Sequence, residues 1–218
     1  HIENEKVTVS FDSSGESLHK RGYRKNVDKA PMNEVLAAGL IKLTGWKCDS
    51  NFVDCMCGSG TLPIEAAMLA MGLPAGFFRK KWGFMTWHDF DAELWQRVMR
   101  EAGAEMEEFD YEILASDHSA KAVEIAKANI ENAHLQYDIK LSKQDMFDVV
   151  PPKGGGIMII NPPYGERLEE KDIINLYRGI GDALKKNFKG FEAWIISSNK
   201  DALKLIGLKP SKKIDVYN

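Results

Sequence analysis

The sequence lacks the features that would place it among membrane, secreted or disulfide-stabilised proteins. None of its apolar runs approaches the roughly 20 residues that a membrane-spanning helix needs, and no signal-peptide pattern occurs. Cysteine is scarce: the 218 residues include three, Cys48, Cys55 and Cys57. Such a small, odd number is typical of a reducing compartment, so we expect a cytoplasmic protein with no membrane partner.

The residues that a metal centre needs are also missing. Cys55 and Cys57 are closely spaced, as zinc ligands often are, but no matching pair of cysteines or histidines follows them. Buried free thiols are the better interpretation, and no metal is expected.

An excess of basic residues is absent too. The 29 lysines and arginines are outnumbered by 32 acidic residues, which leaves a formal net charge of -3. A nucleic acid would therefore have to be bound by local clusters of charge. The densest lies in residues 18–24, LHKRGYR, where Lys20, Arg21 and Arg24 are expected to contact phosphates. A second basic run, at residues 79–81, lies among aromatic residues but fits a solvated loop slightly better.

The chain does contain a regular alternation of strand and helix patterns. At least five alternations predict an α/β fold with a parallel, doubly wound, Rossmann-like sheet between two helical layers. Such sheets bind ligands beyond the carboxyl ends of their strands. The expected strands cover residues 7–11, 51–56, 111–116, 139–141, 156–160 and 192–197, and the expected helices cover residues 33–44, 61–71, 90–106, 119–132, 172–188 and 201–206.

A glycine loop, CGSGT, follows the strand expected at residues 51–56. Gly58 and Gly60 predict that a ligand approaches the backbone closely, because any Cβ there would be in its way. Asp54 can accept a hydrogen bond from an ammonium group. The dinucleotide pattern fails because Pro63 replaces its third glycine, and the phosphate loop fails because its lysine is missing. A cofactor without phosphates fits better, although a simple tight turn would leave the same Gly-x-Gly pattern.

Two further carboxylates follow the next strands of this sheet. Asp117 could bind both hydroxyls of a ribose, as the acidic residue of dinucleotide folds does, or could cap a helix. Asp145 could accept a hydrogen bond from an adenine amino group, with Met146 or Phe147 against the ring. An ordinary surface turn explains Asp145 equally well.

The tetrapeptide NPPY, residues 161–164, follows an apolar strand and resembles the catalytic signature of amino-group methyltransferases. An exocyclic amine is a poor nucleophile, because its lone pair is delocalised into the ring. The side-chain oxygen of Asn161 and the carbonyl oxygen of Pro162 could accept hydrogen bonds from its N–H groups. Pro162 and Pro163 stiffen the loop, and Tyr164 offers a face for stacking of the target base. Termination of a strand is the alternative explanation of Pro-Pro.

Taken together, these segments resemble the THUMP-associated RNA guanine-N2 methyltransferases. The resemblance covers nearly the whole chain, and NPPYGERL is its most specific part. Cys55 departs from the family pattern, which usually has proline there. The segments that carry the resemblance are residues 18–24, Ala30-Pro31, residues 57–61, residues 65–67 and residues 161–168.

This resemblance implies a methyltransferase that uses S-adenosylmethionine to modify guanine N2 in RNA, in 23S ribosomal RNA rather than transfer RNA. Residues 1–30 would be an N-terminal strand and basic connecting segment, and residues 31–218 the methyltransferase catalytic domain. The RNA-capturing THUMP domain is expected to be missing, and the C-terminal strand to be cut short. The residues implied in cofactor binding are Asp54, Cys57, Gly58, Ser59, Gly60, Thr61, Asp117, Asp145, Met146 and Asn161.

Three other functions remain open at this point. Methylation of adenine N6 in DNA uses the same acceptor chemistry, and many relatives carry an older label of that kind. Methylation of a protein glutamine amide also uses NPPY-type loops. The last alternative is a non-catalytic domain that binds the cofactor and associates with RNA, against which the intact Asn161 and Tyr164 argue.

Overall fold

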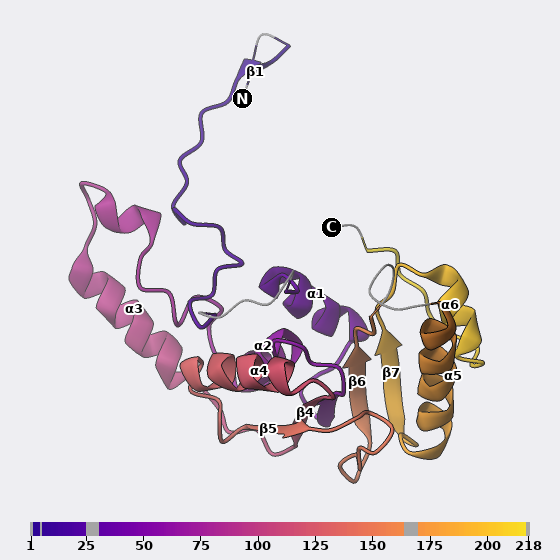
Figure 1. Ribbon diagram of the computed structural model, residues 1–218. Helices are drawn as coiled ribbons and strands as arrows, with labels where there is room; N and C mark the ends of the chain where they lie inside the picture. The colour runs from indigo at the N-terminus through magenta and orange to yellow at the C-terminus, as the bar shows by residue number, and fades with distance from the viewer. Residues whose placement is uncertain (1, 5, 25–30, 164–169, 217–218) are drawn as a thin grey trace.

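A parallel five-stranded sheet forms the centre of the protein (Figure 1). The computed structural model describes residues 2–4, 6–24, 31–163 and 170–216. The strands lie in the order β5-β4-β3-β6-β7, so the chain starts in the middle of the sheet and winds to both edges. Their bounds are Asn51–Asp54 for β3, Ile113–Asp117 for β4, Ile139–Lys143 for β5, Gly156–Ile160 for β6 and Phe191–Ile195 for β7.

Helices cover both faces of this sheet, which confirms the predicted three-layer α/β/α fold. Helices α1 (Glu34–Thr44), α2 (Thr61–Ala70) and α4 (Ala120–Asn132) lie over one face. Helix α5 (Glu170–Lys186) covers the other, with α6 (Lys200–Leu205) packed against it (Figure 1). The change of face occurs between β3 and β6, the point at which doubly wound folds bind ligands.

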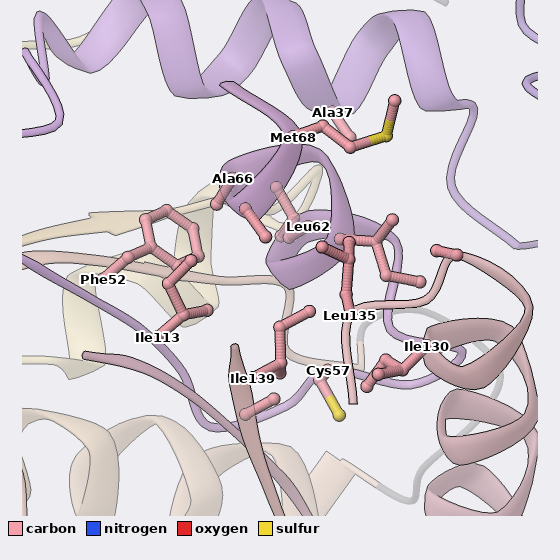
Figure 2. Packing of buried hydrophobic residues seen from close by; sticks show 14 of the residues in the cluster. Ala37, Phe52, Cys57, Leu62, Ala66, Met68, Ile113, Ile130, Leu135 and Ile139 are labelled. Carbon is pink, nitrogen blue, oxygen red and sulfur yellow. The ribbon is translucent and has the colours of Figure 1, made fainter. Parts of the chain in front are cut away.

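The alternation of side chains along each strand divides the core between the two faces. Phe52 and Ile113 pack under α2, beside Ala66 (Figure 2). Their neighbours in sequence point the other way, so Val53 packs with Ile180 of α5. Both faces of the strands are apolar because a parallel sheet with helices on both sides is buried on both sides.

Local signals at the helix ends act as expected. Asn33 caps α1 by accepting hydrogen bonds from the backbone N–H groups of Val35 and Leu36. Gly45, with φ of 81°, ends the same helix in the left-handed conformation that glycine adopts without strain. The start of helix α1 is therefore fixed by the side chain of Asn33, and its end by Gly45.

The strand predicted at residues 7–11 is wrong. The structure has a short antiparallel pair instead, β1 (Ile2–Glu3) with β2 (Lys6–Val7). Val9 and Phe11 are exposed and join no strand ladder within the described residues. An alternating pattern needs a neighbouring strand to become a strand, and this segment instead runs away from the sheet (Figure 1).

The segment between α2 and β4 forms a separate arm. It contains a 3-10 helix, η1 (Gly83–Thr86), and α3 (Ala92–Ala104). Helix α3 has no buried residue and stands beyond α4, away from the sheet (Figure 1). In the described part of the chain, no helix combines the length and the apolar character of a membrane span.

Candidate active site

The motifs identified in the sequence meet at one edge of the sheet. Asp54 ends β3, Asp117 ends β4 and Asn161 follows β6, and these are three neighbouring strands. All three residues line one cavity of about 2430 Å³. Small-molecule pockets usually measure about 300–1,000 Å³, so this cavity has room for a cofactor and part of a second molecule.

The two glycines of the loop have different structural roles. Gly58 has φ of 53°, and a Cβ added there would meet no atom within 4 Å, which leaves open space on the cavity side. Gly60 has φ of 82°, and a Cβ there would come within 3.2 Å of the Cβ of Ala126 in α4. Gly58 is thus the glycine with open space beside the cavity, and Gly60 makes room for helix α4.

Asp54 is buried and only half satisfied. Its Oδ1 accepts a hydrogen bond from the backbone N–H of Met56 at 3.0 Å, while its Oδ2 has no partner among the described residues. Burial raises the pKa of this carboxyl to about 8; the nearby Asp117 adds to this effect, and the Met56 hydrogen bond opposes it. A cation placed against Oδ2 would favour the ionised form, so the site is suited to an ammonium group.

Asp117 joins the glycine loop to helix α4. Its Oδ2 accepts from the Gly58 N–H at 3.0 Å, and its Oδ1 accepts from the Ser119 N–H at 2.9 Å. Ser119 itself caps α4 by accepting from the Ala122 N–H. The capping role considered for Asp117 therefore belongs to Ser119, and Asp117 remains at the cavity wall beside the exposed ring of His118.

The segment after β5 contributes both a polar and an apolar group to the cavity. Asp145 is exposed and accepts from the Phe147 N–H at 3.1 Å, which is the surface turn that the sequence also allowed. Met146 is buried and packs in the core with Met158. Phe147 lies over Gly179 of α5, where a Cβ would come within 2.7 Å of its ring. Of the two side chains proposed for contact with a ring, Met146 lines the cavity.

The described part of the NPPY segment, residues 161–163, also lines the cavity. The Oδ1 atom of Asn161 is buried and has no hydrogen-bond partner among the described residues. Pro162 is buried and Pro163 partly so, and both line the same cavity. Tyr164 lies outside the described residues. A buried acceptor without a donor costs free energy, so Asn161 is arranged to receive a donor from a bound molecule.

The glycine loop has a support that the sequence analysis missed. Asn129, which is buried in α4, donates a hydrogen bond from Nδ2 to the carbonyl oxygen of Ser59 at 3.0 Å. The two residues are 70 positions apart. A polar residue within the apolar face of α4 was the available signal.

The roles expected for Arg21 and Arg24 are corrected. The guanidinium of Arg21 pairs with Glu65 of α2, with Nη2 and Oε2 3.1 Å apart, and its side chain is 10% exposed. Arg21 also donates from Nε to Oε1 of Glu65, and Tyr23 donates a third hydrogen bond to the same carboxylate. Arg24 pairs with Glu34 at 2.8 Å and donates to the Thr61 hydroxyl at 2.7 Å. These two arginines are held by carboxylates and tie the basic segment to α1 and α2, so their charges are not free for phosphates.

We expect Arg21→Ala to lower the free energy of unfolding by about 3 kcal/mol, because it leaves the Glu65 carboxylate buried without its cation. Burial already raises the pKa of Glu65, and the Arg21 and Tyr23 hydrogen bonds oppose that rise. Removing Arg21 raises this pKa further, so the variant should lose more stability at pH 8 than at pH 5. Urea unfolding at both pH values measures the difference.

Lys20→Ala is the matched control for this prediction. Lys20 pairs with Glu16 at 3.2 Å, but both side chains are more than half exposed. Such a pair contributes less than about 1 kcal/mol. Equal unfolding curves for the two variants would contradict a structural role for the buried pair.

Comparison with known proteins identifies relatives over nearly the whole chain. The family model described as RMKL-like, methyltransferase domain (UPF0020), matches residues 21–218. A provisionally named RNA methyltransferase from Synechocystis is 36% identical over 220 residues, covering 100% of this chain and 57% of that protein. The ribosomal RNA large subunit methyltransferase K/L of Shewanella baltica is 35% identical over 224 residues, covering 100% of this chain and 32% of that protein.

Solved structures give the same picture. A provisionally named methyltransferase, SMU.472, crystallised with SAH, matches with a TM-score of 0.87 and 37% identity, over 95% of this chain and 54% of that chain. A predicted N6-adenine-specific DNA methylase from Listeria monocytogenes matches with a TM-score of 0.85 and 34% identity, over 94% of this chain and 54% of that chain. The chain thus spans between 32% and 57% of the length of these four relatives.

Proposed function

The chain belongs to the RMKL-like methyltransferase domain family, and on that basis we propose that it transfers a methyl group from S-adenosylmethionine to a base in RNA. Family membership makes it an S-adenosylmethionine-dependent methyltransferase domain, and a relative with 37% identity was crystallised with SAH. We further propose that the methyl group is transferred to the exocyclic N2 of a guanine in 23S ribosomal RNA.

The observation that carries this proposal is a pair of buried, unpartnered acceptors in one cavity. Asp54 Oδ2 and Asn161 Oδ1 both line it, and neither has a hydrogen-bond donor within the described part of the chain. Two separate donors would satisfy them. An ammonium group on the cofactor suits Asp54, and the N–H group of a target amine suits Asn161.

The cofactor would lie along the ends of β3, β4 and β5. Asp54 would hold its ammonium group, Asp117 its ribose hydroxyls, and Asp145 its adenine amino group, with Met146 against the ring. The open side of Gly58 admits it close to the backbone. When bound, it supplies a methyl group on a positively charged sulfur. The other proposed contacts come from Cys57, Ser59, Gly60 and Thr61 in the loop and from Asn161.

The chain's own contribution to the reaction would be positioning. Asn161 Oδ1 and the Pro162 carbonyl would accept from the two N–H bonds of the amine and turn its lone pair toward the methyl group. Pro163 would keep the loop stiff, and Tyr164 would stack on the base. Orientation of this kind would supply a large part of the rate. As the nitrogen gains the methyl group it would release one proton to solvent, and S-adenosylhomocysteine would leave.

Ribosomal RNA is favoured as substrate by the names of the relatives. The Shewanella baltica protein, 35% identical, is named as a ribosomal RNA large subunit methyltransferase. A paired base cannot present its amine to a buried methyl group, so the target guanine would lie where flipping costs little, in a hairpin, bulge or junction.

Adenine-N6 methylation of DNA is the second candidate. The Listeria monocytogenes structure, 34% identical, is named for that activity. An adenine amine would meet the same two acceptors, so the geometry around Asn161 suits either base.

Nucleoside mass spectrometry tests the proposal against this alternative. Ribosomal RNA and DNA from cells lacking the gene would be digested and compared with those of the parent. We expect loss of N2-methylguanosine from large-subunit RNA and unchanged N6-methyladenine in DNA. An unchanged N2-methylguanosine level together with loss of N6-methyladenine would replace the first proposal by the second. Restoration by the intact gene, and not by an Asn161→Ala copy, would assign the loss to this site.

A further inference from the structure

Two basic segments that are far apart in the sequence line one groove of about 740 Å³. We propose that this groove binds the phosphodiester backbone of the RNA next to the target nucleotide; the inference rests on the proposed function. The groove is formed by parts of residues 16–24, 31–34 and 78–81. Six of its lining side chains are lysine or arginine and two are glutamate, although the whole chain carries a net charge of -3.

The lysines supply the charge that is free for phosphates. Lys80 and Lys81 are exposed and have no ion pair with any described residue. Lys20 is 55% exposed and pairs only weakly with Glu16 at the surface. Exposed lysines at the rim of a groove can follow a flexible phosphate chain at little cost.

The arginines hold the groove in shape. Arg79 donates to the carbonyl oxygens of Ser14, Glu16 and Ser17 and lies 4.3 Å from the centre of the Trp82 ring. It thereby joins the 79–81 segment to residues 14–17, which directly precede the basic segment. Arg21 and Arg24 fix the other wall through their buried carboxylate partners. The groove is therefore formed before any ligand binds, which reduces the entropy cost of binding.

The groove lies next to the active-site cavity. Pro31, Met32 and Asn33 line both of them. A nucleic-acid strand held by its phosphates along Lys20, Lys80 and Lys81 would therefore reach the cavity that contains Asn161. This position suits the groove to the RNA strand that carries the target base. Basic residues elsewhere, such as Lys185 and Lys186 on α5, line neither the groove nor the cavity.

The test uses the double charge reversal Lys80→Glu/Lys81→Glu and the 218-residue chain. The probe is a fluorescein-labelled 12-nucleotide oligouridylate, with binding followed by anisotropy at several KCl concentrations. We expect at least tenfold weaker binding at 100 mM KCl and a log–log salt slope that is smaller by about 1.4, since each contact with a single strand contributes about 0.7. The Kd for S-adenosylmethionine should stay within twofold of wild type by calorimetry.

Lys185→Glu/Lys186→Glu is the control, because it makes the same change of charge on exposed residues outside the groove. It should bind the oligonucleotide within twofold of wild type. Equal losses in the two double variants would mean that net charge alone is measured and would overturn the groove. The proposal would also be overturned if Lys80→Glu/Lys81→Glu binds the oligouridylate as wild type does and weakens only the binding of an oligothymidylate DNA of the same length.

Failure of the groove can be told apart from failure of the proposed function. Methyl transfer to ribosomal RNA is followed with the same proteins and tritiated S-adenosylmethionine. If the Lys80→Glu/Lys81→Glu variant methylates ribosomal RNA at the wild-type rate, the proposed function stands and the groove is rejected. Transfer by wild type to DNA but not to RNA would reject the proposed function whatever the oligouridylate binding shows.

Discussion

Replacing Asn161 by alanine should lower kcat for methyl transfer by roughly 100-fold or more and leave the Kd for S-adenosylmethionine within a few fold. The lost oxygen would act mainly on the reacting amine as its nitrogen becomes tetrahedral. An interaction that strengthens in the transition state is lost from kcat rather than from ground-state binding. Single-turnover methylation with calorimetric measurement of cofactor affinity separates the two effects.

The structure also predicts what Asn161→Ala should do to stability. Because Asn161 Oδ1 is buried without a donor in the described structure, its removal should leave the melting temperature unchanged or slightly higher. Asn161 would then be a residue that lowers stability and is kept because methyl transfer requires it.

Asn161→Asp is the informative second variant. It keeps an acceptor oxygen and removes the amide donor, so it should retain more activity than Asn161→Ala. If Asn161→Ala methylates at the wild-type rate, Asn161 has no part in the mechanism. Asp and Ala variants that are equally inactive would show that the amide N–H group matters, and not the acceptor.

Asp54→Asn should weaken S-adenosylmethionine binding by roughly 10- to 100-fold, the usual range for loss of a hydrogen bond to a charged partner. In the absence of a ligand, burial holds the pKa of Asp54 at about 8. Binding of an ammonium group would require the ionised form. Wild-type protein should therefore release close to one proton per cofactor at pH 7, and its affinity should rise about tenfold from pH 6 to 7 and less steeply from pH 7 to 8, as the pH approaches the pKa.

Calorimetry in two buffers of different ionisation enthalpy measures this proton release directly. Asp54→Asn should release no proton and should show a flat affinity over the same pH range. Asp148→Asn, which changes an exposed carboxylate outside the cavity, is the matched control and should behave as wild type. Binding without proton release by the wild-type protein would separate Asp54 from the ammonium group.

The sign of the stability effect is opposite to that of the binding effect. An unfolded aspartate has a pKa of about 3.9, whereas that of Asp54 in the folded protein is about 8. Between these values the folded state holds a proton that the unfolded state lacks, so this group makes the wild-type protein less stable as the pH rises. Asp54→Asn does not titrate, and its stability relative to wild type should be greater at pH 9 than at pH 5.

The alternation of strands and helices was readable from the sequence because each element carries its own local signal. Asn33 and Gly45 mark the ends of α1, which agrees with the helix expected at residues 33–44 to within one residue. Where a strand is buried on both faces, as β6 is, a continuous apolar run is sufficient to predict it. The predicted strand at residues 7–11 failed because alternation alone does not supply a pairing partner.

Family membership was also predicted from the sequence, and the match over residues 21–218 confirms it. The motifs at Gly58 and at residues 161–164 could be read because close backbone approach and a rigid acceptor loop each require particular residue types. The choice of guanine N2 in ribosomal RNA remains a prediction, since the same acceptors suit another amine.

The layers of the fold, the order of the motifs and the chemical class of the site therefore follow from the amino-acid sequence alone. The use of charges and of distant residues depends on the folded chain. Arg21 and Arg24 stand in a basic run with Lys20, yet Glu65 and Glu34 neutralise the first two. The raised pKa of Asp54, the support of Ser59 by Asn129 and the meeting of two basic segments in one groove have the same origin: burial and pairing depend on residues that are brought together only when the chain folds.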